Sequence, residues 1–88
     1  MITVYIPSPL RPLTGDQPEI QLEGRTVGEV MENFKIRFPE ACARFFSPRT
    51  ERYLNLYLNE EDVRVLQGTD TLVREGDELT IVFAVGGG

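Results

Sequence analysis

The stretch TVGEVMENFKIRF, residues 26–38, decides the fold, because its apolar residues recur at the spacings of three and four that build an amphipathic helix. These residues are Val27, Val30, Met31, Phe34 and Phe38. Thr26 followed three residues later by Glu29 forms a capping box, which marks a helix start. Pro39 disfavours helical geometry in the residue before it, so we expect the helix to end near Phe38. The opposite face carries polar side chains and is expected to be solvated surface: Glu29, Glu32, Asn33 and Lys35.

Two strands are predicted before this helix. ITVYIP (2–7) places Ile2, Val4 and Ile6 on one face, with Thr3 and Tyr5 on the other. PSPLRPLTGDQPE (7–19) holds four prolines, which predicts a long connecting loop without regular pairing. IQLE (20–23) alternates again, so the two strands are expected to form a hairpin, closed by Gly24.

Two further strands are predicted after the helix. RYLNLYLNEEDVR (52–64) alternates three leucines with Tyr53, Asn55 and Tyr57, followed by a turn and by a short edge strand at VRVL (63–66). REGDELTIVFAV (74–85) places a Gly76-Asp77 turn before a last, strongly apolar strand. Between the helix and these strands, EACARFFSP (40–48) predicts a short second helical turn, with Phe45 or Phe46 closing the edge of the core.

One amphipathic helix in a chain of 88 residues must cover one face of one sheet, because its apolar stripe has nothing else to pack against. We therefore predict an α+β fold of the β-grasp (ubiquitin-like) type. It has a mixed sheet of four to five strands, with the first and last strands parallel neighbours and the main helix on one face. Residues 1–83 would form this domain and residues 84–88 a flexible C-terminal tail.

Composition argues against several classes of function. The net charge of −5 and the scattered basic residues disfavour nucleic acid as a partner, and no apolar run approaches a membrane span. No signal peptide is visible, so a cytoplasmic protein is expected. The chain contains no histidine, and its single cysteine, Cys42, lies between alanines, as a small buried residue would. Nothing in the body of the chain indicates an active site or a metal site.

The whole chain resembles the ubiquitin-like sulfur carriers of the ThiS and MoaD family. The resemblance rests on the strand order, on EGDELTIV (75–82) leading into the last strand, and on the final pair Gly87-Gly88. LRPLTG (10–15) and LNLYLNEEDVR (54–64) are most similar to the carrier that supplies sulfur for cysteine biosynthesis.

This resemblance implies a protein cosubstrate rather than an enzyme, with no cofactor of its own. A partner activating enzyme, using ATP and Mg²⁺, would adenylate the Gly88 carboxylate, and sulfur would then displace AMP to leave a thiocarboxylate. A sulfur-acceptor biosynthetic enzyme would receive that sulfur. Gly86, Gly87 and Gly88 would form a slender tail without side chains. A Cβ on Gly87 or Gly88 would obstruct the entry of this tail into a partner's channel. No maturation cleavage is expected.

Partner docking is predicted on the sheet face away from the helix, because exposed aromatic residues are frequent at protein interfaces. The residues expected there are Tyr5, Tyr53, Tyr57 and Val82, with Val85 at the start of the tail.

Three classes of function remain open from the sequence. A sulfur carrier is the preferred hypothesis. Cysteine synthesis is the preferred receiving pathway, and molybdopterin and thiamine thiazole assembly are the alternatives. A ubiquitin-like modifier would use the same adenylate to acylate lysines on other proteins. A plain β-grasp binding module would have an incidental glycine tail.

Overall fold

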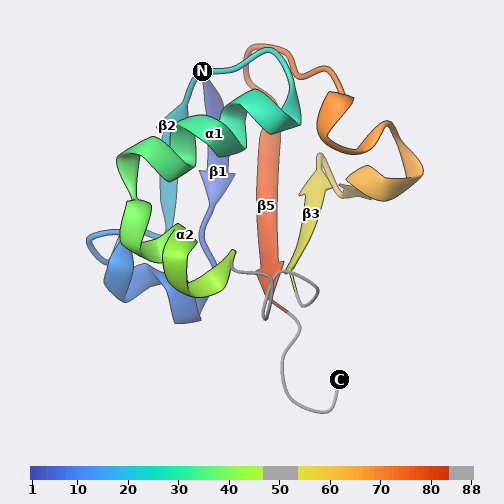
Figure 1. Cartoon of the computed structure of the whole chain (residues 1–88). Helices are drawn as coiled ribbons and strands as arrows, with labels where there is room; N and C mark the ends of the chain where they lie inside the picture. Colours follow the sequence, from blue (N-terminus) through green and yellow to red (C-terminus); the bar gives the residue numbers. More distant parts are fainter. Residues whose placement is uncertain (47–53, 84–88) are drawn as a thin grey trace.

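The computed structural model describes residues 1–46 and 54–83, which form a five-stranded mixed sheet with two α-helices packed on one side (Figure 1). The strand order is β2-β1-β5-β3-β4. Along the chain the elements are β1 (Ile2–Tyr5), the 3₁₀ helix η1 (Ser8–Leu13), β2 (Glu19–Leu22), α1 (Val27–Arg37), α2 (Pro39–Phe45), β3 (Leu54–Leu58), β4 (Glu61–Asp62), the 3₁₀ helices η3 (Val63–Val65) and η4 (Gly68–Asp70), and β5 (Glu78–Phe83).

The first and last strands lie side by side and parallel in the sheet, with Val4 opposite Leu79. β2 pairs antiparallel with the outer edge of β1, and β3 pairs antiparallel with β5. This arrangement, with α1 across one face, is the predicted β-grasp, and the prediction is confirmed.

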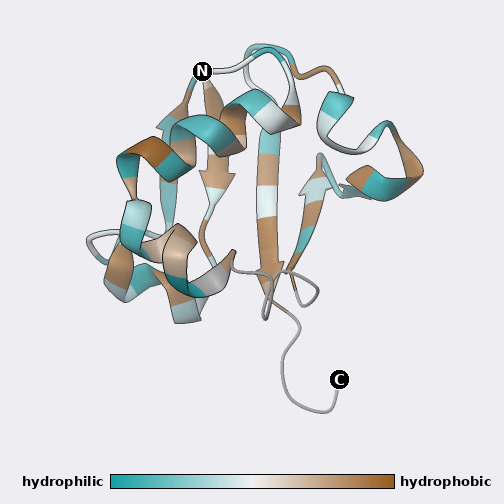
Figure 2. Cartoon of the chain, in the orientation of Figure 1, coloured by the Kyte–Doolittle hydropathy of each residue, from teal (hydrophilic) through white to brown (hydrophobic). Residues whose placement is uncertain are grey.

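The start of α1 follows the predicted capping box. The backbone N–H of Glu29 donates to Thr26 Oγ1 at 3.1 Å, and the Glu29 carboxylate accepts from the backbone N–H of Arg25 at 3.0 Å. The helix ends at Arg37 because Phe38 leaves helical geometry immediately before Pro39. The exposed face is mainly polar, with Ile36 as an exposed apolar residue, and the ribbon of α1 alternates between hydrophilic and hydrophobic segments (Figure 2).

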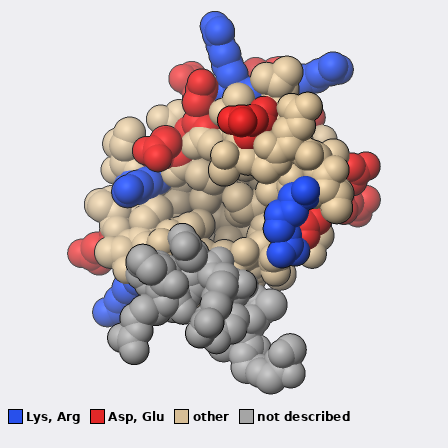
Figure 3. Space-filling view, turned by 45° about the vertical axis from the view of Figure 1, so that its right-hand side comes forward, with Lys and Arg blue, Asp and Glu red and all other residues tan. Residues whose placement is uncertain are grey.

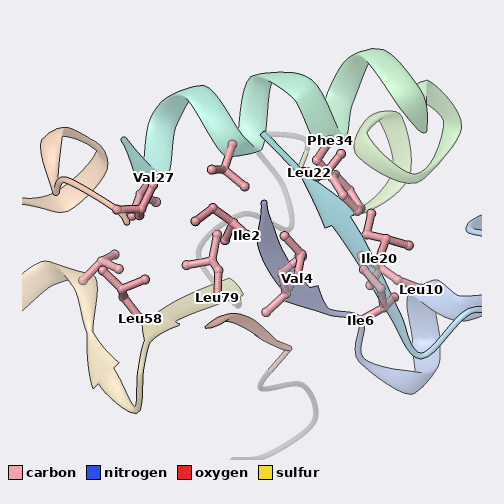
Figure 4. Close-up of a cluster of buried hydrophobic side chains, with 14 of the residues drawn as sticks. Ile2, Val4, Ile6, Leu10, Ile20, Leu22, Val27, Phe34, Leu58 and Leu79 are labelled. Atoms are coloured by element: carbon pink, nitrogen blue, oxygen red, sulfur yellow. The ribbon is translucent and has the colours of Figure 1, made fainter. Parts of the chain in front are cut away.

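The core lies between α1 and the sheet. Ile2, Val4 and Ile6 point to this side as predicted, and Leu79 and Ile81 join them from β5. Figure 4 shows Phe34 of α1 above the strands, close to Leu22 and Ile20. Phe34 is fully buried, and burial of a side chain of this size contributes about 1.5–3 kcal/mol to stability.

Three local predictions were wrong or incomplete. The proline-rich connection is not wholly irregular, because Ser8–Leu13 forms η1, with a proline at its start and Leu10 buried. The edge strand expected at 63–66 is wrong, because Val63–Val65 forms a 3₁₀ turn. The Asp62 carboxylate caps this turn by accepting a hydrogen bond from the backbone N–H of Arg64. The edge strand of the sheet is Glu61–Asp62 instead.

The second helical segment is longer than expected: α2 spans seven residues, because Pro39 can occupy a first helical position as well as end the preceding helix. Phe46 packs against the core as predicted, whereas the side chain of Phe45 lies outside the described part.

Candidate functional site

The last described residue, Phe83, ends β5, the middle strand of the sheet. β5 is held on one side by β1 and on the other by β3, where Phe83 lies opposite Leu54. The predicted tail, with Val85, Gly86, Gly87 and Gly88, lies outside the described residues, as does Tyr53. The structure therefore fixes the point from which the tail departs.

The sheet face turned away from α1 is called here the outer face. Alternation along the strands assigns to it Thr3, Tyr5, Glu19, Gln21, Asn55, Tyr57, Glu78, Thr80 and Val82, because their neighbours in sequence point into the core. Tyr5 and Tyr57 lie opposite Thr80 from its two sides, and Val82 lies opposite Asn55 one step closer to the tail. Both tyrosines are half-buried and Val82 is 37% exposed. Three of the predicted docking residues thus share one surface.

Two carboxylates flank Tyr5 on this face. The Tyr5 hydroxyl donates to Glu78 Oε2 at 3.2 Å, and Glu19 lies opposite Tyr5 on β2. Desolvation and the negative charges of Glu78 and Glu19 raise the pKa of the Tyr5 phenol above its ordinary value. The sequence did not single out these carboxylates, because their position beside Tyr5 depends on strand register.

At the β4 edge, Asp62 and Arg64 form a local ion pair with an N–O distance of 2.6 Å. The Arg64 side chain donates to both carboxylate oxygens of Asp62. These bonds lower the pKa of Asp62 below its ordinary value. The ionised carboxylate in turn neutralises the positive charge of Arg64.

On the helix side, a hollow of about 630 Å³ lies between α1, α2 and β3. Its lining includes Met31, Cys42, Phe46 and Leu56, with Glu32 and Lys35 among its charged residues. The face turned forward in Figure 3 is hollowed near its centre, and mainly uncharged atoms border the hollow. Cys42 is buried as predicted, and burial raises the pKa of its thiol, which argues against a reactive thiolate.

Within residues 1–46 and 54–83, no group of three or more metal-ligating side chains comes together. No helix in these ranges is long and apolar enough to cross a membrane.

Comparison with known proteins places this geometry in a family. The model of the ThiS family matches residues 4–88, nearly the whole chain. The chain belongs to the ThiS family. It is a carrier protein, a cosubstrate rather than an enzyme, as the sequence predicted.

Relatives of this ThiS-family carrier cover its full length. The sulfur carrier protein CysO of Mycobacterium tuberculosis is 37% identical over 91 residues, spanning 99% of this chain and 98% of the relative. In the crystal structure of the Amycolatopsis orientalis BexX/CysO complex, a chain 38% identical superposes with a TM-score of 0.87, with 100% of both chains covered.

A second type of protein has the same fold. The solution structure of the small archaeal modifier protein 1 from Methanosarcina acetivorans is 27% identical to the carrier, with a TM-score of 0.83. The alignment covers 99% of this chain and 95% of the archaeal one.

Proposed function

We propose that the ThiS-family carrier delivers sulfur as a thiocarboxylate on Gly88, in the cytoplasm, where ATP is available. A partner activating enzyme uses ATP and Mg²⁺: the Gly88 carboxylate attacks the α-phosphate of ATP, and pyrophosphate leaves. A sulfur nucleophile then attacks the acyl carbon and AMP leaves. The observation that carries this proposal is the full-length match to the ThiS family and to CysO.

The fold supports this role because it holds the tail root rigidly. β5 is paired on both sides, so the strand leading to residues 84–88 keeps a fixed direction relative to the outer face. Five extended residues span roughly 17 Å at about 3.3–3.6 Å per residue. A tail of that length reaches a buried partner site while the body stays docked outside it. Fixing these residues on docking costs about 1–2 kcal/mol each, which contacts of the body must offset.

Those contacts are proposed to come from the outer face, with Tyr5, Tyr57 and Val82 at its centre, and from Tyr53 and Val85, which lie outside the described residues. Both the activating enzyme and the acceptor enzyme would use this surface in turn, because each must receive the same tail. Val82→Asp should weaken binding to the activating enzyme about tenfold or more, because a buried unpaired charge is strongly unfavourable at an interface.

Ile36→Asp is the matched control for this test. Ile36 is 75% exposed and lies on α1, on the opposite side of the sheet from Val82. Its substitution introduces the same charge into the same class of apolar residue, and binding should be unchanged. Equal affinities of the two variants would refute the docking assignment.

The central test of function is the intact mass of the carrier after incubation with ATP, Mg²⁺, the activating enzyme and a sulfur donor. The expected product is heavier than the starting chain by the difference between one sulfur and one oxygen atom. A chain lacking Gly86, Gly87 and Gly88, which then ends in Val85, should gain nothing. An unmodified wild-type mass would overturn the proposed function.

Cysteine biosynthesis is the proposed destination of the sulfur, supported by the similarity to CysO over the whole chain. Molybdopterin and thiamine thiazole assembly are the alternatives. Purified acceptor enzymes of the three pathways are added separately to the thiocarboxylate form, each with its own acceptor substrate. The added mass should be lost only with the cysteine-forming enzyme, as the sulfur bonds to the substrate and water restores the Gly88 carboxylate.

A second candidate function is ubiquitin-like modification, favoured by the structural similarity to the small archaeal modifier protein 1. In that case the Gly88 adenylate would acylate lysine amines of other proteins. Conjugates of higher mass in lysates, lost when Gly86, Gly87 and Gly88 are deleted together, would support the modifier, and their absence would argue against it.

A further inference from the structure

Within residues 1–46 and 54–83, no ion pair neutralises the two strand carboxylates of the outer face. Its two strand carboxylates, Glu19 and Glu78, come from different strands and lie on the two sides of Tyr5. The strand residues of this face, from β1, β2, β3 and β5, include no lysine or arginine.

Two of the described arginines are engaged elsewhere, and one of them, Arg11, donates its Nε–H to the backbone carbonyl of Ile6 at 3.0 Å. Arg64 follows β4 at the far edge of the sheet, and its guanidinium is bound to both oxygens of Asp62. By strand order, β5 and β3 separate it from β1. Among the described residues, the charges of Glu19 and Glu78 are therefore left for a partner to neutralise; desolvation first, and these two carboxylates after it, raise the pKa of the Tyr5 phenol.

The charged and apolar parts of the outer face follow an order along β5. Glu78 stands at the start of the strand, Thr80 between the two tyrosines, and Val82 next to the tail. At a rise of about 3.3 Å per residue, the backbone positions of Glu78 and Val82 are about 13 Å apart. The surface therefore changes from apolar to acidic with distance from the tail.

We propose that the outer face recognises an activating enzyme whose docking surface is apolar at the mouth of the tail channel and basic about 13 Å from it. Lysine or arginine side chains of the enzyme would pair with Glu19 and Glu78 while apolar residues cover Val82 and Tyr57. This inference rests on the proposed function, since it names the chemistry of the surface that receives the same tail.

Complementary rim charges act mainly on the rate of encounter, and their effect is screened by salt. The two carboxylates should therefore steer the carrier toward its enzyme, whereas the apolar contacts and the tail hold it there. This division predicts which kinetic constant changes when the carboxylates are neutralised.

The test compares two double variants of the full chain. Glu19→Gln with Glu78→Gln removes both carboxylates of the outer face. Glu32→Gln with Glu40→Gln removes two exposed carboxylates from α1 and α2, so both variants lose the same charge from opposite sides of the sheet. Equal melting temperatures establish that neither pair disturbs the fold.

Association with the activating enzyme is measured by stopped flow from low to high salt, and the Gly88 mass is measured at saturating enzyme. The outer-face variant should associate about three- to tenfold more slowly at low salt, with a flattened salt dependence. The α-helical control should change by less than about twofold. Both variants should still acquire sulfur at saturation.

Two failures are distinguishable. If the wild-type carrier acquires no sulfur, the proposed function is overturned, and this inference falls with it. If wild type acquires sulfur but the outer-face variant associates as fast as the control, or retains the full salt dependence, the inference alone is overturned.

Discussion

The contact between Gly24 and α1 provides a sharp test of how the body of the carrier is held together. An ideal Cβ on Gly24 would lie 2.6 Å from Val30 Cγ2, 2.8 Å from Val30 N and 3.1 Å from Val30 Cα. The side chain of Val30 is fully buried in the core, and its backbone belongs to α1. The atoms near the added Cβ therefore cannot move away without displacing the helix.

Gly24→Ala should therefore be strongly destabilising. Overpacking of a well-packed site costs about 1–3 kcal/mol, and a non-glycine residue at the Gly24 φ of +159° adds about 1 kcal/mol. A loss near 3 kcal/mol corresponds to a melting temperature about 12–24 °C lower for a domain of this size. Thermal and urea unfolding, followed by circular dichroism, measure this loss.

Gly68→Ala separates the two contributions. Gly68 has a φ of 59°, but no atom lies within 4 Å of its ideal Cβ, so this substitution tests the backbone conformation alone. It should cost about 1 kcal/mol, or about 4–8 °C. If Gly24→Ala is no more destabilising than Gly68→Ala, the close approach of Gly24 to α1 does not constrain the fold, and the reasoning is refuted. Below its melting temperature, the Gly24 variant should still accept sulfur on Gly88.

Three further predictions concern single side chains. Thr26→Ala removes the N-cap of α1 and should lower the stability by about 1 kcal/mol, whereas Thr26→Ser should restore most of it in the same unfolding assay. Cys42 should react with iodoacetamide at neutral pH at least about tenfold more slowly in the native chain than in urea, because burial raises its thiol pKa; equal rates would contradict the buried position. Asp62→Asn should lower the melting temperature slightly at neutral pH, and the difference from wild type should vanish on acidification. The sign follows from the lowered pKa of Asp62: its stabilisation is present above the ordinary value of 3.8 and is lost as the pH falls through the folded value, so a difference that persists at lower pH would argue against the ion pair.

Regular periodicity predicted the parts of the fold that bury apolar surface. The helix from Thr26 to Phe38 and the alternation in 2–7, 52–64 and 74–85 specified a helix on a mixed sheet, because each pattern has one core-facing side. The pattern misled at VRVL, where alternating apolar residues lie in a capped turn. Asp62 before that segment was the available signal, since aspartate is a preferred capping residue.

The site was predictable only in part. Tyr5, Tyr57 and Val82 were assigned to one face from their alternation within each strand, and the structure places them there. The position of Glu19 and Glu78 on the two sides of Tyr5 required the register between three strands, which a single sequence does not specify. The roles of Gly88 and of Val85 came from resemblance to the family and remain proposals.

The pairing of β5 with β1 and β3 also determines how the molecule responds to a mechanical pulling force. A partner that pulls on the tail loads β5 along its own axis, with β1 parallel on one side and β3 antiparallel on the other. Such a load must shear both ladders together, instead of peeling one hydrogen bond after another from a free edge. The body of the carrier should therefore resist unfolding when force is applied at the end of β5.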